Sequence, residues 1–150
     1  EAHHHFANDP QVEMKVIAGP LVQESSWQAL RSRARGQKRL RLVRHVTDLC
    51  AELSNAAVSI SQAGYNTCLD VLRAGVPALL VPFTKEEEDE QRRRALRLES
   101  LGLVKVLAQE EQTPERLAAE IRGQMDFKFP KTTLDLGGAQ CTVKTIESML

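Results

Sequence analysis

Short apolar runs alternate with amphipathic stretches along most of the chain. The apolar runs predict five strands, over residues 14–18, 40–46, 58–60, 78–81 and 103–107. The fourth run, Ala78-Leu79-Leu80-Val81, is apolar at every position, which is typical of a parallel strand buried on both faces. Because strands that alternate with helices form right-handed βαβ units, the pattern predicts an α/β fold with a Rossmann-like doubly wound parallel sheet.

Capping residues and apolar periodicity predict helices between and after these strands. The predicted helices cover residues 27–30, 48–53, 65–74, 89–101, 113–122 and 139–149. Ser25 or Ser26 is expected to cap the first helix, Asp48 the second and Thr113 the fifth, because their side-chain oxygens accept hydrogen bonds from free first-turn amides. Gly75 is expected to end the third helix in the left-handed conformation.

The length of 150 residues is that of one ordinary domain, which we assign to residues 6–150. Within this domain, residues 126–138 are predicted to form a loop. The amphipathic helix that follows carries Val143, Ile146 and Leu150 on one face.

The chain begins with Glu1-Ala2-His3-His4-His5. Three consecutive histidines can bind a metal ion, but a purification-tag remnant is the simpler interpretation, so residues 1–5 are set aside from the fold reasoning. A start at such a place also predicts that the chain is an excised fragment.

The charge balance argues against a nucleic-acid partner. The chain has 20 basic and 20 acidic residues, and its aromatic content is 4%. Binding to a phosphate backbone needs an excess of clustered cations, and binding to single strands needs aromatic platforms. The three cysteines, Cys50, Cys68 and Cys141, have no metal-knuckle spacing, so free thiols in a reducing cytoplasm are expected. No stretch approaches 18 apolar residues and no signal peptide is visible, which predicts a cytoplasmic protein with no transmembrane segment.

The segment from Ser61 to Thr67 links a predicted strand to a predicted helix, where doubly wound sheets bind their ligands. Gly64 permits close backbone approach, and the helix start presents free amides to an anion. Thr67 and Asp70 share a helix face, and the Asp70 carboxylate has the chemistry to accept hydrogen bonds from a ribose diol. The alternative, a solvated helix residue, is equally consistent with the pattern.

Two further segments follow predicted strands. Val81-Pro82-Phe83-Thr84 precedes a charged run over residues 85–94, which suits a solvated helix face with acids before bases. Gln91 stands apart in that run because it is uncharged and near the helix start. The other segment, Gly19-Pro20-Leu21, either borders a diphosphate or is only a turn. It has neither a dinucleotide fingerprint nor a P-loop pattern.

No catalytic triad can be assembled from the sequence. His45 is the only histidine outside the initial cluster, and a packed or solvated side chain is the simpler interpretation. Trp27 is interpreted as helix packing, and Cys68 as a small core residue. No catalytic residue, metal ligand or cofactor is assigned.

The string from Ser61 to Phe83 resembles the C-terminal, donor-binding domain of MurG-type glycosyltransferases, the family 28 enzymes with GT-B architecture. The family pattern is S-x-x-G-x-x-T-x-x-E, then G-x-P, then a buried strand that ends in V-P. A helix with a glutamine and a later Leu-Gly follow, here Gln91 and Leu101-Gly102. The Ser61–Thr67 string is also similar to that of a bacterial group of predicted glycosyltransferases. The resemblance extends over residues 14–150, and its central 23 residues are the specific part.

The resemblance implies a donor-binding role for nine residues. They are Gly19, Val46, Ser61, Gly64, Tyr65, Asn66, Thr67, Asp70 and Gln91. Val46 would offer its backbone to uracil, Asp70 would hold the ribose hydroxyls and Gln91 would reach the donor sugar. Residues 64–67 would line the diphosphate and nucleoside. The chain has Asp70 where the family has Glu, and only Gly19-Pro20 where it has a glycine-rich loop, so the nucleotide's identity stays open.

The function implied is binding of a nucleotide-sugar donor, a UDP-sugar, for transfer of a hexosyl group to an acceptor. In such enzymes an N-terminal domain binds the acceptor, and residues 126–150 would pack on it. We therefore expect this chain to bind donor and to lack transferase activity alone. One alternative is half of a sugar-nucleotide 2-epimerase, against which the single His45 argues. Another is a non-catalytic binding subunit or interaction module that works with a separate partner.

Overall fold

The structure is a computed structural model that describes residues 1–83, 89–130 and 138–149. The strands are β1 (Met14–Ile17), β2 (Leu40–Val43), β3 (Ser59–Ser61), β4 (Ala78–Leu80) and β5 (Lys105–Val106). The α-helices are α1 (Glu24–Ala34), α2 (Leu49–Ser54), α3 (Tyr65–Ala74), α4 (Glu90–Ser100), α5 (Pro114–Met125) and α6 (Gly138–Glu147). Two short 3₁₀ helices are η1 (Ala2–Phe6) and η2 (Gln109–Glu111). The predicted alternation of strands and helices is confirmed.

All the strand pairs are parallel, as predicted. Within the described residues they form two sets, β1-β2 and β3-β4-β5, rather than one continuous hydrogen-bonded ladder. β4 is the middle strand of its set, with Leu79 paired to Ile60 of β3 and to Lys105 of β5. The parallel βαβ order puts the ends of β3 and β4 at the same edge, since their residues run in register up to Ser61 and Leu80.

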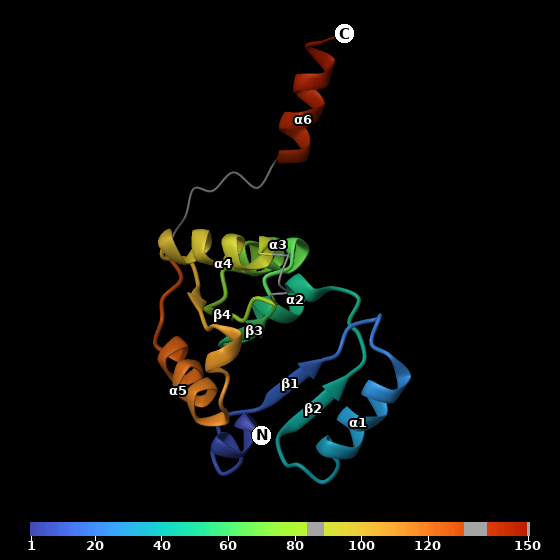
Figure 1. Ribbon diagram of the computed structural model, residues 1–150, viewed down its shortest axis with the longest axis vertical. Coiled ribbons are helices and arrows are strands. Elements are labelled where there is room, and N and C mark those ends of the chain that lie inside the picture. The colour runs from blue at the N-terminus through green and yellow to red at the C-terminus, as the bar shows by residue number, and fades with distance from the viewer. Residues whose placement is uncertain (84–88, 131–137, 150) are drawn as a thin grey trace.

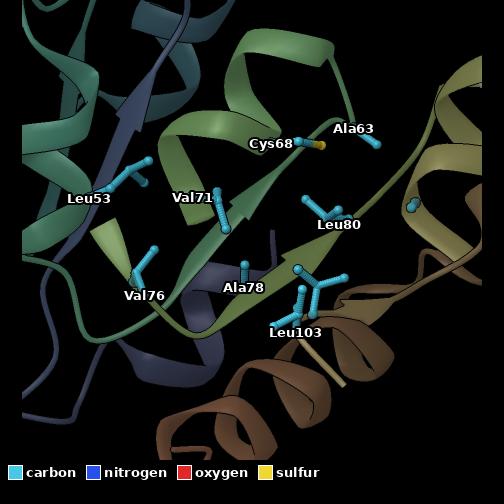
Figure 2. Close-up of a cluster of buried hydrophobic side chains, with 10 residues drawn as sticks. Leu53, Ala63, Cys68, Val71, Val76, Ala78, Leu80 and Leu103 are labelled. Carbon is cyan, nitrogen blue, oxygen red and sulfur yellow. The ribbon is translucent and has the colours of Figure 1, made fainter. Parts of the chain in front are cut away.

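The core is built around β4. Ala78, Leu79 and Leu80 have no exposed surface, as the continuous apolar run predicts. Helices α3 and α4 lie on one side of β3 and β4 in Figure 1, and α5 lies on the other. Figure 2 shows Cys68 and Val71 of α3 in the same buried cluster as Leu80 of β4. These contacts fix where α3 begins, and with it the position of the loop before it.

The helix ends follow the predicted capping chemistry except at α1. Asp48 Oδ1 accepts a hydrogen bond from Ala51 N at 2.9 Å, and Thr113 Oγ1 accepts from Arg116 N at 3.1 Å. Gly75 ends α3 at φ 63°, in the left-handed region. The prediction of a Ser25 or Ser26 cap for α1 is wrong. The helix begins earlier, at Glu24, after an extended Gln23 with no side-chain cap.

The first residues take part in the fold. Phe6 is 4% exposed and packs with Ala118 and Ile121 of α5, and the Arg122 guanidinium lies 4.8 Å from its ring centroid. The buried His3 ring lies with Nε2 3.3 Å from Lys38 O. These contacts do not bear on the origin of residues 1–5, which stays a hypothesis, but they give η1 a structural role.

Helix α6 stands apart from the rest of the molecule in Figure 1. Its expected apolar face is exposed, with Val143 and Ile146 each 53% accessible, and Leu150 lies outside the described residues.

Candidate functional site

Four of the predicted site residues lie at or after the carboxyl ends of three strands, β1, β2 and β3. Gly19 follows β1 and Val46 follows β2. Ser61 is the last residue of β3, and Gly64 directly precedes α3. In open parallel sheets this edge is where ligands bind, because the strand-to-helix loops and the helix amino ends meet there.

The amino end of α3 is uncapped. Gly64 occupies the N-cap position in an extended conformation, φ −62° and ψ 150°, and no side chain caps the helix. Its carbonyl accepts the first helical hydrogen bond, from Cys68 N at 2.9 Å. A Cβ added at Gly64 would meet only Thr67 Oγ1, at 3.8 Å. The backbone approach to the first-turn amides is therefore open, and the helix dipole favours an anion there.

The first two turns of α3 carry the other predicted residues. Tyr65 is 65% exposed and Asn66 is exposed, whereas Thr67 and Asp70 are partly buried. Within the described residues, the Asp70 carboxylate has no hydrogen bond or ion pair. Its acceptor capacity is thus available, which is compatible with both the diol-binding and the solvated interpretation.

Ser61, the last residue of β3, brings a polar side chain to the segment that leads into this helix. Its Oγ is buried and has no hydrogen-bond partner in the part of the chain that the structure describes. Its backbone carbonyl is used by the sheet and accepts from Val81 N at 2.8 Å. Buried hydroxyls are nearly always hydrogen-bonded, so an unpaired one at a strand-to-helix loop is a position for a further partner.

Helix α4 reaches the same edge through Gln91. Its Oε1 accepts a hydrogen bond from Phe83 N at 3.2 Å, which ties the segment after β4 to the start of α4. Gln91 is partly buried, in contrast to the exposed Arg92 and Arg93 beside it. The proposed contact of Gln91 with a donor sugar stays a prediction.

Arg94 is a site-edge residue that the sequence reasoning missed. Its Nη1 donates a hydrogen bond to Ala63 O at 2.7 Å, and its Cζ lies 5.7 Å from the Tyr65 ring centroid. It also forms an i,i+4 ion pair with Glu90. The interpretation of residues 85–94 as a solvated face fails at Arg94, because helical spacing puts it on the face of Gln91 and next to the buried Ala95. The i,i+4 spacing would also pair Glu88 with Arg92, but Glu88 lies outside the described residues.

The loops after β1 and β2 are joined by Arg44. Its Nη1 donates to Glu24 Oε2 at 2.8 Å, and its Cζ lies 5.7 Å from the Trp27 ring centroid. The Arg44 hydrogen bond, followed by that of Gln28, lowers the pKa of the Glu24 carboxyl below its ordinary value. Gly19 adopts φ 91°, so a side chain at this position would be strained.

Cys68 and Cys50 are free thiols, and Cys141 has no described side chain. Burial raises the pKa of the Cys68 thiol, against a smaller opposite effect of the Arg94 charge, so Cys68 acts as a core side chain. The described residues contain no group of three His, Cys, Asp or Glu side chains placed to hold a metal ion. His45 is exposed. No helix among the described residues has the length and apolar character needed to cross a membrane.

Known proteins with similar sequences are glycosyltransferases. An enzyme from Nitrosococcus oceani is 38% identical over 54% of this chain and 23% of its own length. One from Hahella chejuensis is 30% identical over 67% of this chain and 28% of its own. Both are named UDP-N-acetylglucosamine–N-acetylmuramyl-(pentapeptide) pyrophosphoryl-undecaprenol N-acetylglucosamine transferase. The chain thus spans about a quarter of the length of the curated relatives that it matches.

Solved structures show the same fold. The structure of Acinetobacter baumannii MurG superposes with a TM-score of 0.59 at 28% identity, over 77% of this chain and 34% of that one. The glycosyltransferase VinC in complex with dTDP gives 0.61 at 23% identity, over 83% and 29%, which shows a common fold alone. These neighbours are GT-B enzymes with Rossmann-like domains, so the predicted fold class is confirmed.

The family profile described as the glycosyltransferase family 28 C-terminal domain matches residues 11–133, which include every predicted site residue. The chain belongs to the glycosyltransferase family 28 C-terminal domain family.

Proposed function

We propose that this domain binds a UDP-sugar at the carboxyl edge of β3 and β4, as the donor half of a hexosyltransferase. The observation that carries the proposal is the uncapped amino end of α3 at Gly64, together with the buried Ser61 Oγ at the end of β3, which has no hydrogen-bond partner among the described residues. Backbone amides and a helix dipole bind a diphosphate, and the buried hydroxyl of Ser61 supplies one more donor.

The remaining contacts follow from position. Asp70 lies on the first turns of α3 with its carboxylate unpaired among the described residues, and it would accept hydrogen bonds from the ribose hydroxyls. Residues 64–67 would line the diphosphate, with Gly19 opposite. Val46, after β2, would offer backbone groups to the uracil. Gln91 would hold the sugar through its amide nitrogen, since its oxygen already accepts from Phe83 N.

The chemistry that these residues supply is one half of a transfer reaction. A helix amino end stabilises the negative charge that grows on the departing diphosphate. The attacking acceptor hydroxyl needs a base within about 3 Å, and the exposed His45 follows β2 and not β3 or β4, whose carboxyl edge forms the proposed site. We therefore assign acceptor and base to a partner domain N-terminal to this one, in a protein that works at the cytoplasmic side.

Calorimetry tests the proposal directly. The chain would be titrated with UDP-N-acetylglucosamine, UDP-glucose, UDP, dTDP, GDP and uridine, with folding checked by circular dichroism. Binding of uridine diphosphate compounds, and weaker binding of GDP, is the expected result. A folded chain that binds none of the diphosphates would overturn the proposal. Sugar transfer by this chain without any partner domain would overturn the assignment of the acceptor site and the base to a partner domain.

A further inference from the structure

Helix α4 holds both loops of the proposed site through two side chains on one face. Gln91 accepts from Phe83 N after β4, and Arg94 donates to Ala63 O after β3. The two residues are three positions apart, which places them on the same side of a helix. One rigid element therefore sets the spacing between the two loops.

The Arg94 hydrogen bond acts on the peptide unit that leads into α3. Ala63 is completely buried, and its carbonyl belongs to the same planar peptide as the Gly64 amide. In a trans peptide the C=O and N–H point in opposite directions, so the 2.7 Å bond to Ala63 O also fixes where Gly64 N–H points. This hydrogen bond matters at Gly64 because a glycine backbone has more conformational freedom than that of any other residue.

The same guanidinium also contacts the first residue of α3. Its Cζ lies 5.7 Å from the ring centroid of Tyr65, within cation–π range. The Arg94 side chain is 21% exposed, and Glu90 pairs with it from the solvent side, being 83% exposed. A planar group with five donors can serve Ala63, Glu90 and the Tyr65 face at once, which a lysine ammonium cannot do equally well.

We propose that Arg94 is a positioning residue for diphosphate recognition, acting through the Ala63 carbonyl and the Tyr65 ring to orient the Gly64 amide and the amino end of α3. This inference rests on the proposed function of the site. It differs from an ordinary stabilising role because its effect is confined to the phosphate end of the ligand.

The experiment compares Arg94→Met and Arg94→Lys with the matched control Arg93→Met. Arg93 is an exposed residue of the same helix. Its replacement by Met removes the same charge as Arg94→Met but leaves the hydrogen bond to Ala63 O in place. Calorimetry with UDP and with uridine separates the two ends of the ligand. Arg94→Met is expected to weaken UDP binding about tenfold and uridine binding less than twofold. Arg94→Lys should recover part of the loss, and Arg93→Met should match the wild type.

Equal losses for UDP and uridine, or unchanged UDP affinity in Arg94→Met, would overturn the inference. If Arg94→Met fails to fold, the Arg94→Lys ratio of UDP to uridine affinity decides by the same criterion. Amide exchange at Gly64 and Tyr65 in nucleotide-free protein gives an independent reading, since faster exchange is expected only in the Arg94 variants. A wild-type chain that binds no UDP instead contradicts the proposed function, whereas normal wild-type binding with unaffected Arg94 variants contradicts only this inference.

Discussion

The Arg44 guanidinium, directly after β2, donates a 2.8 Å hydrogen bond to the Glu24 carboxylate in the first turn of α1. Arg44 also donates to Val22 O at 3.4 Å, so one side chain spans the loop that connects β1 to α1. That loop contains Gly19, and Arg44 lies two residues before Val46. Arg44 thus links the segment after β2 to the end of the β1–α1 loop and to the start of α1.

Replacement of Arg44 by Met should raise the pKa of Glu24 toward its ordinary value, because the Arg44 hydrogen bond is the largest cause of its lowering. A pKa lowered in the folded state stabilises the fold above the unfolded pKa, and that contribution is lost as pH falls through the folded pKa. A carbon-detected NMR titration of the Glu24 carboxyl measures the change. Arg41→Met is the matched control, since Arg41 pairs with Glu13 at 3.6 Å. An unchanged Glu24 pKa in Arg44→Met would contradict the assignment.

Replacement of Asp70 by Ala is expected to weaken UDP binding by about 1.5–3 kcal/mol, the range for hydrogen bonds to a charged group. The thermal midpoint should stay near that of the wild type, since the carboxylate has no ion pair among the described residues. Calorimetry measures the loss of UDP affinity, and thermal denaturation measures the midpoint. Asp126→Ala, at the exposed end of α5, serves as the control. Wild-type affinity in Asp70→Ala would leave Asp70 as a solvated helix residue.

Replacement of Gly64 by Ser should stabilise the fold and weaken binding together. The extended N-cap geometry suits a serine, whose hydroxyl would accept from a first-turn amide and stabilise the helix by roughly a few tenths of a kcal/mol relative to glycine. The same amides would then be unavailable to a diphosphate. Gly64→Ala adds a Cβ, which has room beside Thr67, but no acceptor. Urea unfolding and UDP titration of both variants test the idea, and a Ser variant that binds UDP more tightly than Ala would contradict it.

The Cys68 thiol predicts a decline in stability at alkaline pH. Burial raises its folded pKa, so the unfolded chain loses the proton first. The free energy of unfolding should therefore be unaffected below the unfolded pKa of about 8.5 and fall as pH rises above it. Urea unfolding at pH 7 and pH 9.5 measures this in a Cys141→Ser background. In Cys68→Ala, the free energy of unfolding should fall less between pH 7 and pH 9.5 than in the parent protein. In Cys50→Ala it should fall as much as in the parent. Equal decreases in the two variants would contradict the prediction.

Elements with strong local signals were predictable from the sequence. The four-residue apolar run of β4 and the Gly75 stop of α3 were both predicted and are confirmed. In each case a local property, continuous apolarity or positive φ, decides the structure without help from distant residues. The start of α1 was predicted wrongly because Ser25 and Ser26 carry good capping oxygens, but the long-range bond from Arg44 favours Glu24 in the first turn.

The loop of the candidate site was predictable from the sequence, but the side chains that contact and hold this loop were not. The glycine and the strand-to-helix connection mark residues 61–67, which the chain places at the carboxyl edge of β3. Arg94 was hidden in a run of arginines, since charge alone does not distinguish a solvated side chain from one that reaches a buried carbonyl 31 residues earlier. Reading Gln91, Arg94, Ala95 and Leu98 as one helix face would have singled it out. The lack of a hydrogen-bond partner for the Ser61 hydroxyl among the described residues was not predictable, because it depends on tertiary packing that the local sequence does not encode.

The packing of η1 on α5 has a kinetic consequence. Arg122 Nη2 donates to His5 O at 2.9 Å across 117 residues of chain, whereas β3 meets β4 after a single helix. Contacts that close a long loop cost more chain entropy, so the ends of the domain should join after β3, α3 and β4 have assembled. The Phe6 contact therefore forms late, and its opening would free η1 while α5 keeps its packing on β4 and the Gly64 loop stays formed.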